Sequence, residues 1–418
     1  MSQRRFIASS SEYEPPLSSD FEHDLETSLR LLSLLENPST SQPIHDLLQA
    51  QNIQDDLARM LSARSIISTT SSFAVGQAKT NEETSHTRTF RKIGAGACGA
   101  VFAADGESLS YKIGKTGILD DEAALWTDFN MHGYIMKALR KFKADIEITN
   151  VHIYINHDNK EWWEKHRELK MAASSACNLP ARVLVTERIL PLPAPIREKL
   201  VDQFCKKDLS ASALADPANK DCLVRIYLGS MKGHTTSFFS LRNFKLHLNQ
   251  MIDIGLDFEM LAVSIGQTLA IIHWEAQADA RDVEFVLGSS ATVLDKEQTK
   301  DIHANDSVTT INKPTESFVR RETRLFVLDF NQVRRITMDD EGVACAVEAF
   351  YLNDPYYPRP CEESNIQQEL WNSFVRSYLG TADIILRDQE EYRVLPRRFI
   401  SGVIEHTVEK RKMASAAE

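Results

Sequence analysis

The chain has 418 residues, of which 43% are hydrophobic and 26% are charged, so it has the composition of a globular protein with a sizeable core. No apolar run approaches the roughly 20 residues of a membrane-spanning helix, and the start of the chain lacks the apolar segment of a secretory signal. The net charge of −11 argues against a chain built as a whole to bind DNA. We therefore expect a cytoplasmic protein that neither spans a membrane nor binds DNA.

The cysteines are too scattered for a zinc finger or a disulfide framework. No two of them form the Cys-x-x-Cys pair that is typical of zinc ribbons. We expect reduced thiols and no metal site. The six are Cys98, Cys177, Cys205, Cys222, Cys345 and Cys361.

The first part of the chain, residues 1–87, is predicted to be a short helical and partly disordered extension. Apolar residues recur at helical spacing at Phe21, Leu25, Leu29 and Leu32. Pro38 ends this pattern, and a second helix is expected within residues 44–66. A Ser/Thr-rich stretch without periodicity, residues 68–89, then reads as a linker, so we place a domain boundary near residue 88.

The rest of the chain reads as a β-rich part followed by a mostly helical part. Residues 88–190 hold three predicted strands and the helix DDEAALWTDFNMHGYIMKALRKF. The Pro-rich stretch ERILPLP leads into residues 191–418, where a long apolar helix, two short β-rich runs and two C-terminal helices are expected. A polar insertion is expected near residues 288–323. This order predicts an α+β fold with two lobes.

The segment RKIGAGACGAVF carries a glycine pattern that can bring the backbone close to a phosphate. Gly94, Gly96, Gly99 and Val101 match G-x-G-x-x-G-x-V, the Gly-rich loop of protein kinases. A Gly-rich hairpin turn with no ligand has the same pattern, so the motif alone does not decide between the two. Lys112 follows in a β-rich run, where kinases keep a phosphate-pairing lysine, and Glu122 is the predicted partner on the next helix.

Two further stretches resemble the catalytic segments of kinases. Asp279 stands five residues before Glu284, as the catalytic Asp of a kinase stands before its metal-binding Asn. Asp329, Phe330 and Asn331 stand where kinases have Asp-Phe-Gly. Because three such segments occur in the right order, we predict a kinase-like two-lobed fold.

The departures from the kinase pattern bear on function, because a fold does not fix an activity. Gln277 stands where kinases have His, Glu284 replaces the Asn and Asn331 replaces the Gly. Four carboxylates are predicted to share one cleft, those of Asp279, Asp282, Glu284 and Asp329. Such a cluster suits Mg²⁺ with a nucleotide, or the guanidinium or ammonium group of a substrate. Alternatively, Asp282 caps a turn and Arg281 neutralises a neighbouring carboxylate.

Arginines cluster just before the Asp329 segment. Arg320, Arg321 and Arg324 could together bind a polyanion if the fold brings them together. The alternative is an ordinary solvated face, which most charge runs of this kind form.

Several segments of the chain resemble a fungal family labelled as uncharacterised or zinc finger proteins. They are VTERILPLP, DVEFVLG, VLDFNQ and NDPYYPRP, and the resemblance covers roughly residues 88–400. This family includes the arginine-containing cyclodipeptide synthases. The resemblance implies an enzyme that takes arginyl-tRNA and a second aminoacyl-tRNA and releases a cyclo-Arg-Xaa diketopiperazine.

On that reading Asp279, Asp282 and Glu284 act on the reacting amine or hold the guanidinium group. The predicted substrate site adds Asp329, Lys112, Glu122 and the three glycines of the Gly-rich loop, and the arginine cluster contacts tRNA. No cofactor is needed, because the acyl groups arrive as activated esters. Two other functions stay open: a phosphotransferase that uses ATP and Mg²⁺, and a pseudokinase scaffold that only binds. The oligomeric state and the second amino acid are not predicted.

Overall fold

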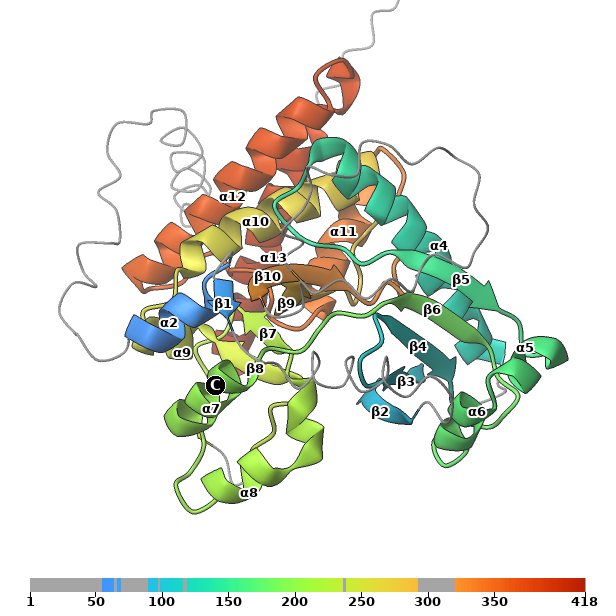
Figure 1. The fold of residues 1–418 in the computed structure, drawn as a ribbon. Helices are drawn as coiled ribbons and strands as arrows, with labels where there is room; N and C mark the ends of the chain where they lie inside the picture. Colours follow the sequence, from blue (N-terminus) through green and yellow to red (C-terminus); the bar gives the residue numbers. More distant parts are fainter. Residues whose placement is uncertain are drawn as a thin grey trace, which may run out of the picture. The chain divides into compact units, whose positions relative to one another are not determined.

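The computed structural model describes residues 55–63, 66–68, 89–96, 98–115, 119–235, 238–291 and 320–417. The helix predicted after Phe21 lies outside these residues. From Ala50 onward the chain forms one compact unit, which is a mixed α+β structure with two five-stranded sheets (Figure 1).

The first sheet has the strand order β2-β3-β4-β6-β5, and every neighbouring pair in it is antiparallel. Its strands are β2 (Phe90–Ala95), β3 (Gly99–Ala104), β4 (Leu109–Gly114), β5 (Val151–Ile155) and β6 (Val183–Glu187). Helix α4 (Leu119–Phe142) joins β4 to β5, as the sequence predicts. The sheet thus brings the Gly-rich segment and the predicted lysine strand side by side.

Side chains alternate between the two faces of this sheet along each strand. One face forms an apolar core that includes Phe102, Tyr111 and Val183, and Trp163 and Leu169 pack against them. These last two come from α5 (Lys160–Lys165) and α6 (Arg167–Ala173). These two short helices meet at His166.

The second sheet has the order β1-β10-β9-β7-β8 and is antiparallel except for the parallel pair β7–β8. Its strands are β1 (Ile66–Ser68), β7 (Val224–Tyr227), β8 (Phe244–His247), β9 (Glu284–Ala291) and β10 (Arg320–Leu328). In the β9–β10 register Leu328 lies opposite Glu284. This register therefore brings the end of the acidic stretch, Glu284, beside the residue that precedes Asp329.

Helices pack around the second sheet, and two of them pack closely along each other. Helix α10 (Phe258–Ala270) begins at Asp257, whose side chain accepts a hydrogen bond from the Met260 amide, and it packs along α12 (Asn365–Ile385). A short π-helical turn, η3 (Ile271–Glu275), extends α10. The remaining elements are α2 (Asp55–Leu61), α7 (Ala194–Phe204), α8 (Ser210–Ala215), η2 (Pro217–Asp221), α9 (Leu248–Asp253), α11 (Asp340–Leu352), η6 (Glu390–Tyr392) and α13 (Leu395–Ala417).

Two predicted boundaries differ from the structure. The strands β9 and β10 extend into both ends of the stretch 288–323, which the sequence assigns to a polar insertion. At the N-terminal side, β1 pairs with β10, and the Thr323 hydroxyl donates a hydrogen bond to the Met60 carbonyl. Residues 55–63 and 66–68, which precede the predicted boundary near 88, therefore belong to the same compact unit as the rest of the described chain.

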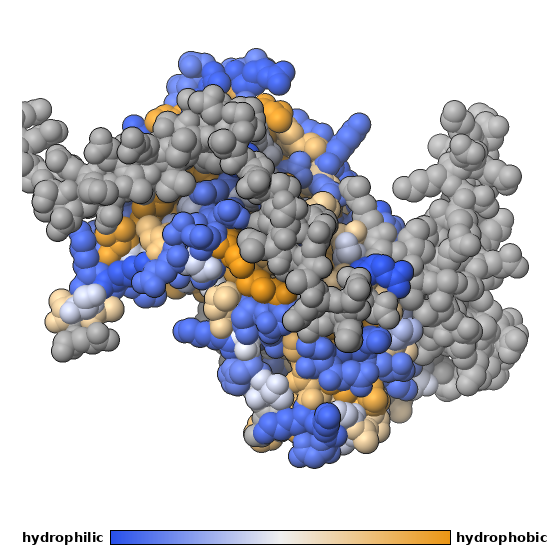
Figure 2. Space-filling view, turned by 90° about the vertical axis from the view of Figure 1, so that its left-hand side faces the viewer, coloured by the Kyte–Doolittle hydropathy of each residue, from blue (hydrophilic) through white to orange (hydrophobic). Residues whose placement is uncertain are grey.

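The surface of the described residues is mainly polar on the face drawn in Figure 2, where hydrophobic residues show only as patches among hydrophilic ones. Among the described helices, none combines the length and the apolar character needed to cross a membrane.

Candidate functional site

Lys112, in the third strand of the first sheet, is held between two carboxylates. Its Nζ lies 2.7 Å from Asp128 Oδ2 on α4 and 2.8 Å from Asp329 Oδ1. Burial by itself lowers the pKa of Lys112, but the two carboxylates raise it well above its usual range. The lysine is therefore a fixed cation that links the first sheet, α4 and the end of β10.

Asp329 stands at a sharp change of chain direction directly after β10. Its φ of 63° lies in the left-handed region, which non-glycine residues seldom adopt. The following amide, Phe330 N, donates to the second oxygen of Asp128 at 3.1 Å, and the Phe330 ring is fully buried 5.0 Å from the ring of His132. Asp128 thus binds both the lysine and the backbone next to Asp329, which fixes their relative position.

Asp282 and Glu284 lie close enough to Asp329 for their charges to interact. Burial raises the pKa of Glu284 to about 7; Arg225 lowers it, whereas Asp329 and Asp282 raise it. Burial and the Asp329 charge also raise the pKa of Asp282. The structure therefore brings together Lys112, Asp282, Glu284 and Asp329, four of the residues that the sequence singles out.

Arg225 on β7 is the direct partner of Glu284. Its Nη2 lies 2.5 Å from Glu284 Oε1, and its Nη1 lies 3.5 Å from Asp354 Oδ2. The Tyr227 hydroxyl donates a short hydrogen bond to the same Asp354 oxygen. Glu284 keeps 17% of its side-chain surface exposed, so one side of this buried network remains open to solvent.

The acidic stretch is anchored from the NDPYYPRP segment. Asp282 N donates to Asn353 Oδ1 at 2.6 Å, and Asn353 Nδ2 donates to the Ala280 carbonyl at 2.9 Å. Ala280 and Asp282 both have left-handed φ values, 56° and 60°. Gln332 Nε2 adds a bond to Asp282 Oδ2 at 2.6 Å. These contacts hold a strained turn that presents Asp282 beside Asp329.

Asp279, the first predicted catalytic acid, is enclosed in the protein. Its side chain has 0% exposed surface, and Arg334 Nε lies 2.6 Å from its Oδ2. Its Oδ1 accepts from the amides of Arg281 and Arg334 at 3.0 Å and 2.9 Å. A carboxylate with no exposed surface and all of these partners has no room for a substrate. We therefore assign Asp279 a structural role, in place of the predicted catalytic one.

The Gly-rich segment forms the β2–β3 hairpin. Gly94 lies in β2, and Gly96 N donates to the Gly99 carbonyl at 2.9 Å across the turn. A Cβ on Gly99 would lie 2.8 Å from the Ile113 carbonyl, so this glycine is required for the close approach of β3 to β4. A Cβ on Gly96 would meet nothing within 4 Å. The packing of β3 against β4 thus explains Gly99, whereas the space beside Gly96 is open.

The other predicted residues are placed less fully. Glu122 lies in α4, but its side chain is outside the described part, and Asp128 provides the contact to Lys112. The Arg320 and Arg321 side chains are also outside it, although both residues belong to β10. Arg324 is paired with Glu322 at 3.0 Å and Glu147 at 3.9 Å, so its charge is balanced within the protein.

Four residues of the site were not predicted from the sequence: Asp128, Arg225, Tyr227 and Asp354. Asp128 lies sixteen residues after Lys112 in a predicted helix, and helical position alone did not distinguish it from Glu122. Asp354 belongs to NDPYYPRP, a segment that carries the family resemblance but gives no sign that this residue lies at the site. Nothing in the sequence near Arg225 pairs it with Glu284, because the contact depends on the β7–β9 pairing.

This arrangement can hold a cation and move a proton. Asp282, Glu284 and Asp329 place negative charge around one fixed lysine, and a carboxyl with a pKa of about 7 exists in both protonation states at neutral pH. Within the described residues, no cluster of three or more His, Cys, Asp or Glu side chains is arranged to hold a metal ion.

Comparison with known proteins yields one family match. The model of the family DUF3669, described as "Zinc finger protein", matches residues 325–390, less than a fifth of the chain. No curated protein matches the chain.

The matched stretch lacks the donors that a zinc finger needs. Structural zinc sites use four Cys or His ligands, but residues 325–390 contain only Cys345 and Cys361 and no histidine. Cys345 lies within α11, and Cys361 is exposed after it. The description of the family therefore finds no support in the residues that this chain has there.

Proposed function

We propose that the chain is a kinase-like, tRNA-dependent cyclodipeptide synthase that joins arginine to a second amino acid. The observation that carries the proposal is the partly open Glu284 carboxylate, with a pKa of about 7, beside Asp282 and Asp329. A base with this pKa can accept a proton from an α-ammonium group at neutral pH. The neighbouring carboxylates suit a guanidinium group, which takes paired charged hydrogen bonds.

The kinase-like part of the proposal is supported by how Lys112 is held. Kinases pair a lysine of the third strand with an acid of the following helix, and an Asp after a later strand completes the site. Here Lys112 contacts Asp128 of the following helix and Asp329 after β10. The use of Asp in place of the helix Glu is a departure from that pattern.

The proposed reaction forms two amide bonds. The α-ammonium group of one aminoacyl-tRNA gives a proton to Glu284, and the free amine attacks the ester carbonyl carbon of the other. A C–N bond forms, the C–O bond to the 3′ oxygen of the tRNA breaks, and that oxygen takes the proton from Glu284. The attacking nitrogen loses a second proton to solvent as it becomes an amide. Repeating the step within the dipeptidyl-tRNA closes the ring and releases the second tRNA. Asp282 and Asp329 hold the guanidinium group during both steps.

The test is a reconstituted reaction with purified full-length protein. Arginyl-tRNA and a mixture of other aminoacyl-tRNAs are supplied, and cyclo-Arg-Xaa products are sought by mass spectrometry. We expect product with charged tRNAs and none with free amino acids and ATP. Absence of any arginine-containing cyclic product with the full set of aminoacyl-tRNAs would contradict the proposal.

A second candidate is an ATP-dependent phosphotransferase, which the Lys112–Asp128 pair favours because kinases use such a pair on phosphates. This activity is measured by incubating the same protein with ATP and Mg²⁺. Phosphate transfer or tight Mg²⁺-dependent ATP binding would favour this candidate. On the synthase proposal we expect neither.

A further inference from the structure

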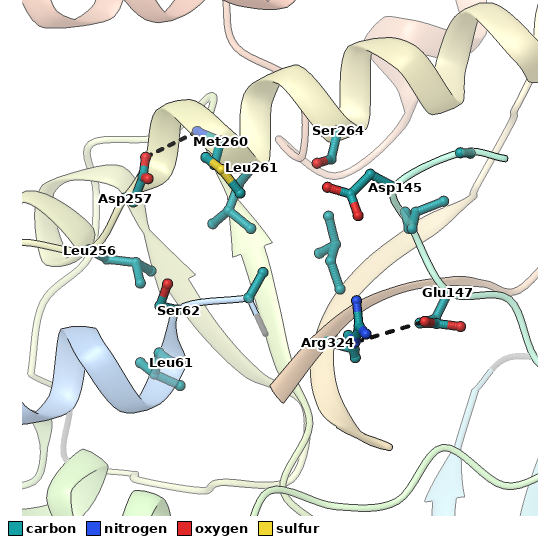
Figure 3. A pocket seen from close by; sticks show the side chains of 14 residues that line it. Leu61, Ser62, Asp145, Glu147, Leu256, Asp257, Met260, Leu261, Ser264 and Arg324 are labelled. Atoms are coloured by element: carbon teal, nitrogen blue, oxygen red, sulfur yellow. Dashed lines mark hydrogen bonds and ion pairs between the residues drawn. The ribbon is translucent and has the colours of Figure 1, made fainter. Parts of the chain in front are cut away.

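A cavity of about 200 Å³ lies at the junction of α2, α10, β10 and the segment that follows α4 (Figure 3). Arg324 lines it, whereas Leu328, at the end of the same strand, precedes Asp329 of the candidate site. The four steps between these two residues span about 13 Å at about 3.3 Å per residue. The cavity is therefore separate from the candidate site, and the inference below does not depend on the proposed function.

The floor of the cavity is apolar. Four leucines line it, each at most 5% exposed: Leu61, Leu256, Leu261 and Leu325. An empty cavity of about 150 Å³ lined by such side chains binds a molecule the size of benzene. This cavity therefore has room for a small organic molecule with an apolar stem, but not for a nucleotide.

The rim of the cavity is negative. Among the described residues, three carboxylates line it, those of Asp145, Glu147 and Asp257, against one cation, that of Arg324. Arg324 pairs with Glu322 at 3.0 Å, which does not line the cavity, and more distantly with Glu147 of the rim at 3.9 Å (Figure 3). The rim thus attracts a cation and repels an anion.

Ser264 supplies an independent sign of a ligand. This residue lines the cavity, is only 8% exposed and forms no side-chain hydrogen bond with any described residue. In Figure 3 its hydroxyl and the Asp145 carboxylate point into the same space. A ligand N–H in that space would give this hydroxyl the hydrogen-bond partner that it lacks among the described residues.

We propose that this cavity binds a small organic cation, an alkyl-guanidinium or alkyl-ammonium, from solution or as the Arg or Lys side chain of a peptide. The charged head lies among Asp145, Glu147 and Ser264 and donates hydrogen bonds to their oxygens. The alkyl stem packs on the leucine floor.

The experiment titrates the full chain with agmatine and follows binding by calorimetry. Butylamine tests the ammonium head, acetyl-arginine methylamide tests the side chain of a peptide, and butan-1-ol tests the stem without charge. We expect one saturable site in the cavity for the cations and no saturable binding of butan-1-ol. Weaker binding of acetyl-arginine methylamide than of agmatine assigns the site to free cations, and the reverse order assigns it to a peptide.

Variants locate the binding. Ser264→Leu fills the cavity and Glu147→Gln removes a charge, and each should weaken agmatine binding at least about tenfold, since a charged hydrogen bond contributes about 1.5–3 kcal/mol. Ser373→Ala, on the neighbouring helix α12, is the matched control and should bind like wild type. Glu284→Gln changes the candidate site and leaves the cavity intact, so it identifies any agmatine that binds at the candidate site.

The proposal is overturned if agmatine shows no saturable binding to wild type. It is also overturned if binding persists unchanged in both Glu147→Gln and Asp145→Asn. These two variants change side chains at the cavity rim, so they keep the test valid if Ser264→Leu lowers the unfolding temperature.

Discussion

Arg225 Nη2 lies 2.5 Å from Glu284 Oε1, across the pairing of β7 with β9. Burial raises the pKa of Glu284, and the guanidinium opposes that rise, so the value of about 7 depends on both. This contact connects the packing of the second sheet to the protonation of the candidate base. It leads to the first prediction.

Replacing Arg225 with Gln should raise the pKa of Glu284 above 7, because the charge that lowers it is lost. If Glu284 is the base, the rate rises with pH as this carboxyl ionises, so the acidic limb of the pH–rate profile should move to higher pH. The profile of product formation between pH 5 and 9 measures the shift. Arg393→Gln, which removes a surface arginine directly after η6, is the control and should leave the profile in place. An unmoved acidic limb in Arg225→Gln would rule out Glu284 as the group that sets it.

The same carboxyl should make stability depend on pH. A carboxyl whose pKa rises from 4.5 in the unfolded chain to about 7 in the folded protein binds protons better when folded. Its contribution is therefore most favourable below pH 4.5 and is lost as the pH rises to about 7, by about 3 kcal/mol at about 1.36 kcal/mol per pH unit. The free energy of unfolding of wild type relative to Glu284→Gln should fall across this window. A constant difference between the two proteins would contradict the raised pKa.

Substitution of Asp279 should lower stability, whereas substitution of Asp282 should lower activity. Asp279→Ala leaves two partly buried amides without an acceptor, those of Arg281 and Arg334, at about 1–3 kcal/mol each. It should therefore lower the free energy of unfolding by about 2–5 kcal/mol. Asp282→Asn keeps the size of a half-buried side chain, so it should lower product formation with little change in unfolding. Denaturant titration and product assays on both variants separate the structural role from the catalytic one.

The sequence predicted the elements better than the contacts. The spacing of glycines, the lysine strand and the following helix gave β2 to β4 and α4 correctly, because each rests on a local pattern. Asp329 and Glu284 were expected to share a site, and the β9–β10 register brings them together. The order of the three motifs along the chain was enough to predict that Asp329 and Glu284 lie together, because each motif lies at the end of a strand.

The role of Asp279 could not be read from the sequence. Its environment depends on Arg334, which lies 55 residues away and approaches only after β9 and β10 pair. The Arg324 prediction was limited in the same way, since its partner Glu147 comes from the segment after α4. Local charge predicted an exposed cluster, whereas the fold provides counter-charges from distant segments.

Exchanging Glu284 for Asn distinguishes the two enzyme classes. Asn is the metal-binding residue at this position in kinases, so on the phosphotransferase reading Glu284→Asn should keep or improve phosphate transfer. On the synthase proposal it removes the base and should lower product formation by about 10²–10⁴, as should Glu284→Gln. Assays of both variants with charged tRNAs, and separately with ATP and Mg²⁺, give the answer. Retained cyclodipeptide formation in both variants would show that Glu284 is not the base.

The ion pairs of Lys112 should contribute clearly to the stability of the fold. Lys112→Met leaves Asp128 and Asp329 without their shared cation, and Asp128 has only 5% of its side chain exposed. Breaking a buried pair in this way costs about 3 kcal/mol or more, so the denaturation midpoint should fall clearly. Lys112→Arg keeps the charge but not the compact ammonium that fits between two oxygens at 2.7 Å and 2.8 Å, so it should recover part of the stability. Adding Asp128→Asn to Lys112→Met should also recover stability, because it removes the buried charge that the first change leaves unpaired. If the double variant is no more stable than Lys112→Met alone, the pair does not hold α4 against the sheet by charge, and the Phe330 amide bond to Asp128 becomes the main link.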